Sequence, residues 1–454
     1  MILLVILCCN LIGIIFIMYK ISKYNYYVDL DDSVIYFNGF TGVLFPIKKT
    51  EHDRIQSLFK DCISFEINYP SVFNKLKEWG FIVDDLLDEV DRIRLCNKLT
   101  VFNNEYYNLI LNPTLECNFN CWYCYENHVK GKMSRETIEK IKKHIDYIVK
   151  EKQVKSFNLA WFGGEPLLYF DDIIYPLSIY AKEVCKDILY SLQITTNAYL
   201  ITLDMINRMK EIGICSFQIT IDGEENIHNK IRNEKGIPSF SKIIENIVLI
   251  CENIPEVRIS LRFNYTDSSL NDSLITVLDK IPLKYRKNIS PYFQRIWQTY
   301  KKSDILTDNK ILLSIRKECK IMGYSISLVD CTFRVGKYHA CYMDRINTVM
   351  INCDSKIYTC TARNYSEKYV LGELNDLGKI VWDMTAFAKK YGRATFENNK
   401  CVECKHLPIC FGTCSQVTSE NRDYKVNNYC RLSVTEVTPE TFIIERYKSF
   451  YDSK

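Results

Sequence analysis

The stretch Leu111-Asn-Pro-Thr-Leu-Glu-Cys117-Asn-Phe-Asn-Cys121-Trp-Tyr-Cys124-Tyr holds three cysteines in a C-x3-C-x2-C spacing and follows a strand-like run. A four-iron cluster takes four ligands, so three thiolates from one loop leave one iron open for another molecule. Zinc sites more often use paired C-x2-C spacings or added histidines, and His128 is the only histidine nearby. The pattern favours an iron–sulfur cluster, with zinc as the alternative.

Around this loop, strand-like and helix-like runs alternate from Tyr106 to about Ile296. Ser134 is a typical N-cap for the amphipathic stretch that continues to Lys150, and Leu203–Ile212 and Phe240–Ile250 have the same helical character. Six strand–helix units predict an α/β fold with a parallel sheet, either open or curled into a partial (β/α)6 TIM-like barrel. The predicted strands are Tyr107–Leu111, Phe157–Phe162, Ser191–Thr195, Phe217–Ile221, Val257–Tyr265 and Ile289–Phe293.

Three further motifs fall where predicted strands end, which is where sites form in parallel α/β sheets. Each motif alone could be an ordinary strand-to-loop turn, although glycine allows a closer backbone approach than any other residue. Together they indicate one site shared with the cysteine loop. The motifs are Gly163-Gly164-Glu165-Pro166, Thr195-Thr196-Asn197, and Thr220-Ile-Asp222-Gly223 followed by His228 and Arg232.

The cysteine loop and these motifs, in this order between residues 107 and 434, resemble the radical S-adenosylmethionine (radical SAM) superfamily. The resemblance implies that the cluster is held by Cys117, Cys121 and Cys124. It also implies that the amino and carboxylate groups of S-adenosylmethionine bind the open iron. An electron from the reduced cluster would then break a carbon–sulfur bond, and the resulting 5′-deoxyadenosyl radical would abstract hydrogen from a substrate.

The same resemblance assigns cofactor contacts to residues of the strand-end motifs. The segment Gly163, Gly164, Glu165 and Pro166 would meet the methionine ammonium. His228 is expected to be structural. The remaining assignments are Thr196 and Asn197 beside the ribose and adenine, Thr220 and Arg232 on the ribose and carboxylate, and Tyr123 near the adenine.

A second group of cysteines lies near the C-terminus and resembles the SPASM extension of radical enzymes that modify peptides and proteins. Ser355 stands where that extension has a glycine. The resemblance implies two auxiliary four-iron clusters, and two structural zinc sites are the alternative. We expect metal, rather than a hydrophobic core, to organise residues 341–430. One cluster would take Cys401, Cys404, Cys410 and Cys430; the other would take Cys341, Cys360 and Cys414, with Cys331, Cys353 or an open iron at its fourth position.

The chain before the core has two further features. Residues 24–100 mix short strands and helices in a pattern that suits a small winged-helix-like module. Such a module resembles the leader-peptide recognition element of peptide-maturing enzymes, with a plain packing domain as the alternative. Met1–Met18 is almost wholly apolar and precedes Lys20 and Lys23, so it predicts either a membrane anchor or a buried helix. The expected division is 1–20 anchor, 24–100 module, 106–300 radical core, 301–340 connector, 341–434 auxiliary-cluster domain and 435–454 tail.

Composition narrows the function further. A net charge of +4 over 454 residues gives no reason to expect a nucleic-acid partner. Twenty cysteines clustered at short spacings indicate metal binding in a reducing, cytoplasmic compartment rather than disulfides. The resemblance to radical SAM enzymes also implies an electron donor of the flavodoxin or ferredoxin type.

We therefore expect an enzyme that modifies a precursor peptide or protein, most specifically a maturase of ribosomally made peptides. One alternative is the anaerobic sulfatase-maturating type, in which an aspartate follows the cysteine matching Cys360. Thr361 occupies that position here, and its hydroxyl is far too weak an acid for the role of that aspartate. The other alternative is a non-catalytic iron–sulfur protein for electron transfer or redox sensing, which would have no use for the cofactor motifs.

Overall fold

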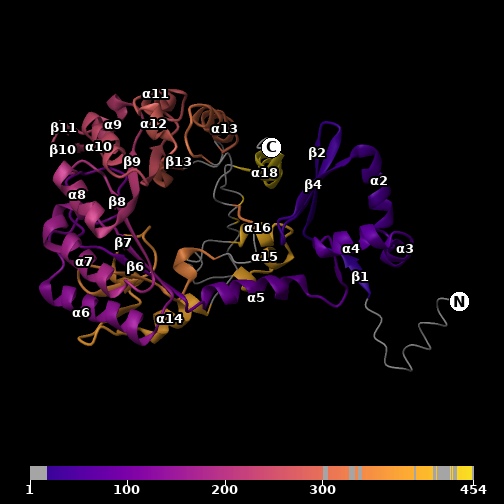
Figure 1. The fold of residues 1–454 in the computed structure, drawn as a ribbon, viewed down its shortest axis with the longest axis horizontal. Coiled ribbons are helices and arrows are strands. Elements are labelled where there is room, and N and C mark those ends of the chain that lie inside the picture. Colours follow the sequence, from indigo (N-terminus) through magenta and orange to yellow (C-terminus); the bar gives the residue numbers. More distant parts are fainter. Residues whose placement is uncertain are drawn as a thin grey trace.

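The computed structural model describes residues 18–299, 305–326, 333–335, 340–392, 395–412, 416, 430, 432 and 437–451. A curved sheet with its helices forms one lobe, and the N-terminal module forms the other (Figure 1). Helix α5 (Glu89–Val101) runs between the two lobes. The predicted anchor, Met1–Met18, lies outside the described residues except for Met18. No helix in the described part of the chain is long and apolar enough to span a bilayer.

The predicted parallel sheet is confirmed. Its six strands are mutually parallel, and each lies beside the strand that precedes it in the sequence, which is the order of a singly wound, curled sheet. The outer face carries α6 (Arg135–Asp146), α7 (Tyr175–Val184), α8 (Leu203–Ile212), α10 (Phe240–Asn253) and α11 (Ser273–Asp279) (Figure 1). The strands are β6 (Tyr106–Leu111), β7 (Ser156–Trp161), β8 (Leu189–Thr196), β9 (Ile214–Ile221), β12 (Arg258–Tyr265) and β13 (Ile289–Arg295).

Local signals position these helices. The Ser134 hydroxyl accepts a hydrogen bond from the Thr137 amide at 3.0 Å, which confirms the predicted N-cap of α6. The last turn of the predicted stretch is a π-helix, Tyr147–Glu151. Helix α8 has the predicted bounds, and it ends where Gly213 adopts a left-handed conformation with φ +86°.

The sheet continues beyond the six predicted strands. Strand β14 (Thr348–Ile351) pairs in parallel with β6, and β15 (Lys356–Tyr358), β16 (Gly372–Leu374) and β17 (Ile380–Trp382) follow as antiparallel neighbours. The expectation that metal organises all of residues 341–430 is therefore wrong for this stretch, because apolar packing organises it. Its buried side chains join the core of the curved sheet: Val349, Ile351, Ile357 and Leu374.

The N-terminal module contains a three-stranded antiparallel sheet, β2 (Asn25–Leu30), β3 (Ser33–Asn38) and β4 (Leu44–Lys48). Strands β1 (Tyr19–Ile21) and β5 (Ile82–Asp84) form a separate antiparallel pair. Buried aromatic side chains, among them Tyr36, Phe65, Phe73 and Phe81, join the sheet to the helices. The helices are α2 (Lys49–Leu58), α3 (Cys62–Asn68) and α4 (Pro70–Glu78).

The C-terminal segments return to the module. Helix α18 (Pro439–Tyr451) lies within the expected tail, and Phe442 packs against Phe37 of β3 with ring centroids 6.2 Å apart. The expected connector contains helix α13 (Ile305–Ile321). The other helices described near this end are short: α14 (Met384–Tyr391), α15 (Asn399–Glu403) and α16 (Leu407–Cys410).

Candidate active site

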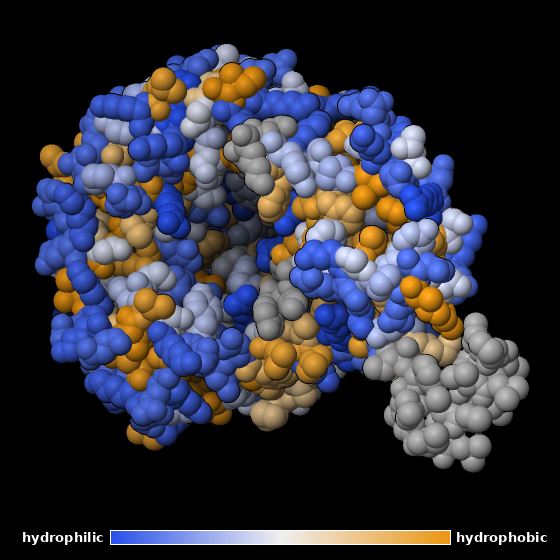
Figure 2. Space-filling view, turned by 45° about the vertical axis from the view of Figure 1, so that its right-hand side comes forward, coloured by the Kyte–Doolittle hydropathy of each residue, from blue (hydrophilic) through white to orange (hydrophobic). Residues whose placement is uncertain are grey.

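A cavity of about 1440 Å³ lies on the inner face of the curved sheet. The molecule is visibly hollowed near its centre (Figure 2). This volume exceeds what one small molecule needs, since ligand pockets commonly measure about 300–1,000 Å³. The lining includes all residues predicted for the cluster and cofactor except Glu165 and Pro166: Cys117, Cys121, Tyr123, Cys124, Gly163, Gly164, Thr196, Asn197, Thr220 and Arg232.

The cysteine loop follows β6 and presents its three thiols to this cavity. The Phe119 amide donates a hydrogen bond to the Cys117 sulfur at 3.4 Å, and the Cys124 amide donates to the Cys121 carbonyl at 3.0 Å. Burial raises the pKa of Cys117 to about 12 and that of Cys124 to about 11. The nearby charge of Arg232 acts in the opposite direction on the pKa of each thiol and favours the thiolate form that binds metal.

The donor set of this loop suits a cluster better than a single metal ion. Within the described residues, no three His, Cys, Asp or Glu side chains are placed to hold one ion. A zinc ion needs its ligands to converge to about 2.0–2.3 Å from one point. Cluster ligands bind separate iron atoms, so three soft sulfur donors around one cavity fit that group.

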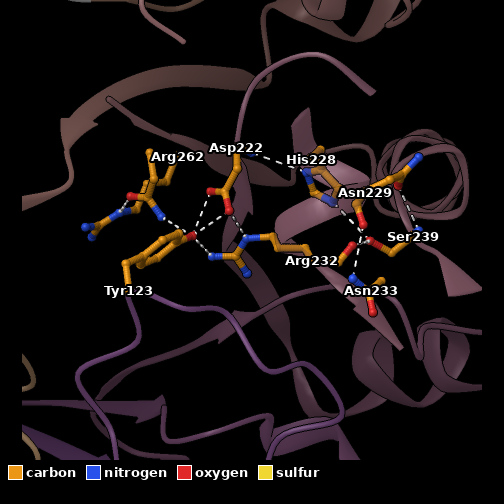
Figure 3. Close-up of polar contacts among 9 residues, drawn as sticks. Tyr123, Asp222, His228, Asn229, Arg232, Asn233, Ser239 and Arg262 are labelled. Carbon is orange, nitrogen blue, oxygen red and sulfur yellow. Dashed lines mark hydrogen bonds and ion pairs between the residues drawn. The ribbon is translucent and has the colours of Figure 1, made fainter. Parts of the chain in front are cut away.

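A buried polar network joins the cysteine loop to the ends of β9 and β12 (Figure 3). The Tyr123 hydroxyl lies 2.8 and 2.6 Å from the two carboxylate oxygens of Asp222. Arg232 forms an ion pair with Asp222 at 2.8 Å and donates to the Tyr123 oxygen at 2.6 Å. Asn264 also donates to that oxygen at 2.9 Å. Burial raises the pKa of Tyr123 well above its usual value, so its hydroxyl stays protonated and can donate to Asp222.

His228 supports this network from behind. Its Nδ1 accepts a hydrogen bond from the Asp222 amide at 3.2 Å, and its Nε2 lies 3.0 Å from the Ser239 hydroxyl (Figure 3). Burial lowers the pKa of His228 to about 3, so the ring is neutral at pH 7. These contacts agree with the expected structural role.

Gly163 and Gly164, which follow β7, lie so close to neighbouring backbone that a larger residue would not fit. Gly163 has φ +110°, and a Cβ there would lie 2.4 Å from the Thr114 carbonyl oxygen. A Cβ on Gly164 would lie 2.1 Å from the Glu116 carbonyl oxygen. Both contacts are with the start of the cysteine loop, so the glycines let this turn press directly against the loop that carries the thiols.

Glu165 lies behind the cavity wall and is fully buried. Its carboxylate accepts hydrogen bonds from the Asn197 amide and the Thr196 hydroxyl, each at 2.7 Å, and from the Leu167 amide at 3.0 Å. Burial raises the pKa of Glu165 to about 7. The side chain therefore ties the turn after β7 to the end of β8. Asn197 extends the connection to the cysteine loop by donating to Asn118 at 2.7 Å.

Sequence reasoning did not select several residues that the structure brings to the site. Asp222 lies within a quoted motif, and Asn264 lies at the end of a predicted strand, so the rule that sites form at strand ends could have found both. Arg262 and Glu126 also line the cavity. Burial raises the pKa of Glu126 to about 8, and its Oε2 has no hydrogen-bond partner in the described chain.

Four of the C-terminal cysteines lie in two pairs. Cys341 and Cys360 lie near Tyr342, whose pKa is raised by burial first and then by the charges of both sulfurs. Burial and the nearby charges of Cys404 and Cys410 raise the pKa of Tyr26 in the same way. The other described members are Cys401, Cys430 and Cys353; Cys331 and Cys414 lie outside the described residues.

Comparison with known proteins identifies a matching family and several relatives. Residues 111–275 match the family described as the radical SAM superfamily. The chain is 25% identical over 397 residues to the radical SAM cyclopropyl synthase TigE of Paramaledivibacter caminithermalis, covering 77% of this chain and 76% of that protein. An uncharacterized protein of Methanocaldococcus jannaschii, MJ0907, is 29% identical over 286 residues, which is 60% of this chain and 90% of that protein.

Two solved structures share the fold. The structure of anSMEcpe with bound AdoMet has a TM-score of 0.53 at 20% identity, covering 76% of this chain and 96% of that chain. Streptococcus suis SuiB bound to the precursor peptide SuiA has a TM-score of 0.52 at 17% identity, covering 90% and 98%. The curved parallel sheet and its cysteine loop define an α/β iron–sulfur enzyme. Residues 111–275 form a radical SAM domain, and enzymes of that superfamily use S-adenosylmethionine and a 4Fe–4S cluster.

Proposed function

We propose that this enzyme is a peptide maturase, which cleaves S-adenosylmethionine and removes a hydrogen atom from a ribosomally made peptide to install a modification. The observation that carries the proposal is the size and lining of the cavity. At about 1440 Å³ it has room for a cofactor beside the cysteine loop and for a peptide segment next to it. When bound, S-adenosylmethionine and the cluster would supply the 5′-deoxyadenosyl radical that abstracts the hydrogen.

In this proposal the chain's own residues hold and orient the cofactor. Cys117, Cys121 and Cys124 bind the cluster. Tyr123 and Arg232, fixed by Asp222, lie at the cavity wall and present hydrogen-bonding groups to the adenine and carboxylate. The other lining groups, Gly163, Gly164, Thr196, Asn197 and Thr220, contact the methionine, ribose and adenine parts, whereas Glu165 and Pro166 position the turn from outside the cavity.

Two auxiliary clusters would complete the metal content. Cys401, Cys404, Cys410 and Cys430 would hold one, and Cys341, Cys360 and Cys414 the other. The grouping of Cys404 with Cys410 near Tyr26, and of Cys341 with Cys360 near Tyr342, supports this division. A flavodoxin or ferredoxin would supply the electron. Residues 1–18 would tether the enzyme to the inner face of the membrane.

The N-terminal module is the proposed binding site for the leader of the precursor peptide. In the described part of the chain, β2 and β4 each pair only with β3, so each has an outer edge that an extended peptide could join. Helix α18 packs against a face of this sheet. Bound peptides in solved structures of the same fold, SuiB with SuiA and anSMEcpe with the Kp18Cys peptide, support a peptide substrate.

The sulfatase-maturating alternative finds no support in the position after Cys360. Thr361 lines the cavity, and its hydroxyl lies 2.8 Å from the Tyr342 hydroxyl. This arrangement places two weakly acidic hydroxyls where that alternative requires a carboxylate.

The test uses anaerobically reconstituted enzyme, a chemical reductant, S-adenosylmethionine and a synthetic copy of a short precursor encoded beside the gene. Mass spectrometry would follow 5′-deoxyadenosine and the peptide. We expect both products only when reductant is present, and we expect deuterium from a labelled peptide to appear in 5′-deoxyadenosine. Cofactor cleavage with an unchanged peptide and no deuterium transfer would contradict the proposal for that peptide, and a sulfatase-derived peptide is the matched comparison.

A further inference from the structure

The inner face of the curved sheet is polar along three neighbouring strands. Alternate residues of a strand point to opposite faces, and on β12 Ile259, Leu261 and Phe263 pack into the core against the helices. The intervening residues of β12 and its neighbours face the cavity, whereas barrel interiors are usually filled by Val, Ile and Leu. The polar residues on this wall are Ser216, Gln218 and Thr220 of β9, Ser260, Arg262 and Asn264 of β12, and Ser290, Tyr292 and Gln294 of β13.

The cavity lining carries more positively charged side chains than negatively charged ones. Arg232, Arg262, Arg295, Arg316 and Arg363 line the cavity, and Glu126 is the one carboxylate among the described lining residues. Arg232 pairs with Asp222 and Arg295 pairs with Asp267. Arg262 has no carboxylate partner among the described residues, and its positive charge favours a ligand that brings its own negative charge.

Arg262 is the arginine best placed to receive that charge. It lies in the middle of β12, in register with Thr220 of β9 and Tyr292 of β13. Its Nε donates to the Asn264 side-chain oxygen at 2.8 Å, and its guanidinium lies 5.9 Å from the Tyr292 ring centroid. In the described residues it has no carboxylate partner, and its two terminal nitrogens make no hydrogen bond. A guanidinium fork held in this way suits a carboxylate.

The position is also close to the cysteine loop. The Asn264 side-chain oxygen accepts a hydrogen bond from Arg262, and its amide nitrogen donates to the Tyr123 hydroxyl at 2.9 Å. One amide side chain therefore links the cationic group to the residue beside Cys124. A ligand carboxylate on Arg262 would lie next to the region where the radical is generated.

We propose that Arg262, oriented by Asn264 and Tyr292, binds the side-chain carboxylate of an aspartate or glutamate in the peptide segment that enters the cavity. This inference rests on the proposed peptide substrate and names its chemical class, an acidic peptide. The contact is a charge-assisted, bidentate hydrogen bond inside a cavity partly shielded from water, where such bonds are strongest.

The probes are two peptides with blocked ends and an uncharged fluorophore, one with two glutamates among glycines and serines and one with glutamines in their place. Binding is measured by fluorescence anisotropy on reconstituted holoenzyme with S-adenosylmethionine. We expect the glutamate peptide to bind about tenfold more tightly, since hydrogen bonds to charged groups are worth about 1.5–3 kcal/mol. Arg262→Gln should abolish the preference and Arg262→Lys should keep part of it. Arg258→Gln is the matched control, because Arg258 begins the same strand, is exposed, and lies outside the cavity lining.

Four results would overturn the inference: equal binding of the two peptides by the native enzyme, an unchanged preference in Arg262→Gln, an equal loss in Arg258→Gln, or a parallel loss of S-adenosylmethionine affinity in Arg262→Gln, which would assign the arginine to the cofactor. Inorganic pyrophosphate is included as a competitor. Its binding through Arg262 without glutamate-peptide binding would point to a phosphate ligand instead. Formation of 5′-deoxyadenosine is measured separately, so a failure of the enzymatic proposal is distinguishable from a failure of this one.

Discussion

The Tyr123 hydroxyl lies 2.6 Å from Oδ2 of Asp222, although the two residues are 99 positions apart in the chain. Tyr123 stands between two cysteines of the cluster loop, and Asp222 follows β9 on the far side of β7 and β8. The contact joins the loop after the first strand of the sheet to the end of the fourth strand. Arg232 forms an ion pair with Asp222, and both side chains are almost fully removed from solvent.

Asp222→Asn should weaken the contact between the cysteine loop and the end of β9. Removing one charge of a buried ion pair leaves the other uncompensated and typically costs about 3–5 kcal/mol. We expect a clear fall in the melting temperature and at least about a tenfold rise in the S-adenosylmethionine dissociation constant, measured by calorimetry on reconstituted enzyme.

Asp267→Asn is the matched control for that substitution. Asp267 also pairs with an arginine, Arg295, but its side chain is 50% exposed, whereas that of Asp222 is 0% exposed. Solvent screening should limit its effect to about 1 kcal/mol or less. Equal effects of the two substitutions would mean that the network around Tyr123 has no special role in cofactor binding.

Cys121→Ala should remove the site-specific cluster. We expect a lower iron and sulfide content per chain and loss of 5′-deoxyadenosine formation to background, because only two thiolates of the loop would remain to hold the cluster. Cys215→Ser is the control, since Cys215 is an exposed cysteine on β9 and outside the cavity lining. Undiminished 5′-deoxyadenosine from Cys121→Ala, or zinc without iron in the reconstituted native enzyme, would refute the cluster assignment.

Gly163→Ala should damage the cysteine loop, and Gly213→Ala should not. Both residues have positive φ, +110° and +86°, so both substitutions carry a conformational cost of about 1 kcal/mol. Only at Gly163 would the new Cβ also meet backbone, the Thr114 oxygen at 2.4 Å, whereas nothing lies within 4 Å at Gly213. Denaturant unfolding and iron content together provide the measurement. Equal stability and equal iron in the two variants would show that the turn can move without disturbing the loop.

The free energy of unfolding should decrease in mild acid because His144 is buried as a neutral ring. Its Nδ1 donates to the Gly378 carbonyl at 2.8 Å, and its Nε2 therefore accepts from the Tyr107 hydroxyl at 2.7 Å. Burial lowers the pKa of His144 from 6.5 to about 4, so the unfolded chain takes up the proton first as the pH falls. The free energy of unfolding should decrease between pH 6.5 and pH 4, by about 2 kcal/mol from pH 7 to pH 5.

His144→Gln provides the comparison for this pH dependence. The variant should be less stable at pH 7, because glutamine cannot reproduce both hydrogen bonds of the buried ring. The difference between the two proteins should narrow toward pH 5, since only the native protein loses the contribution of a neutral histidine. A difference in the free energy of unfolding between the two proteins that stays constant from pH 7 to pH 5 would contradict the role given to His144.

Much of the curved sheet could be predicted because its signals are local. Helix α8 has the predicted bounds, and the six strands are long enough to show as apolar runs. Strands β14 to β17 were missed because they contain three or four residues each. Runs of that length carry too little periodicity to be distinguished from loops, and their place beside β6 is decided by packing.

The placement of the three loop cysteines at one cavity was predictable for the same reason. Cys117, Cys121 and Cys124 lie within one loop, so their spacing along the chain is also their spacing in space. Glu165 shows where this reasoning stops. It belongs to a recognisable motif, yet its carboxylate turns away from the cavity toward Thr196 and Asn197, because those donors lie on the next strand.

The sequence by itself therefore determined the class of enzyme, because the cysteine loop and the strand-end turns are local motifs that can be recognised from neighbouring residues. Pairing between strands was needed to bring Tyr123, Asp222, Arg232 and Asn264 into one network and to set Arg262 on the cavity wall. Strand register decides which face each side chain meets, and a shift of one residue would move Arg262 from the cavity into the apolar core. Contacts of that kind depend on neighbours far away in the chain, which only the folded molecule defines.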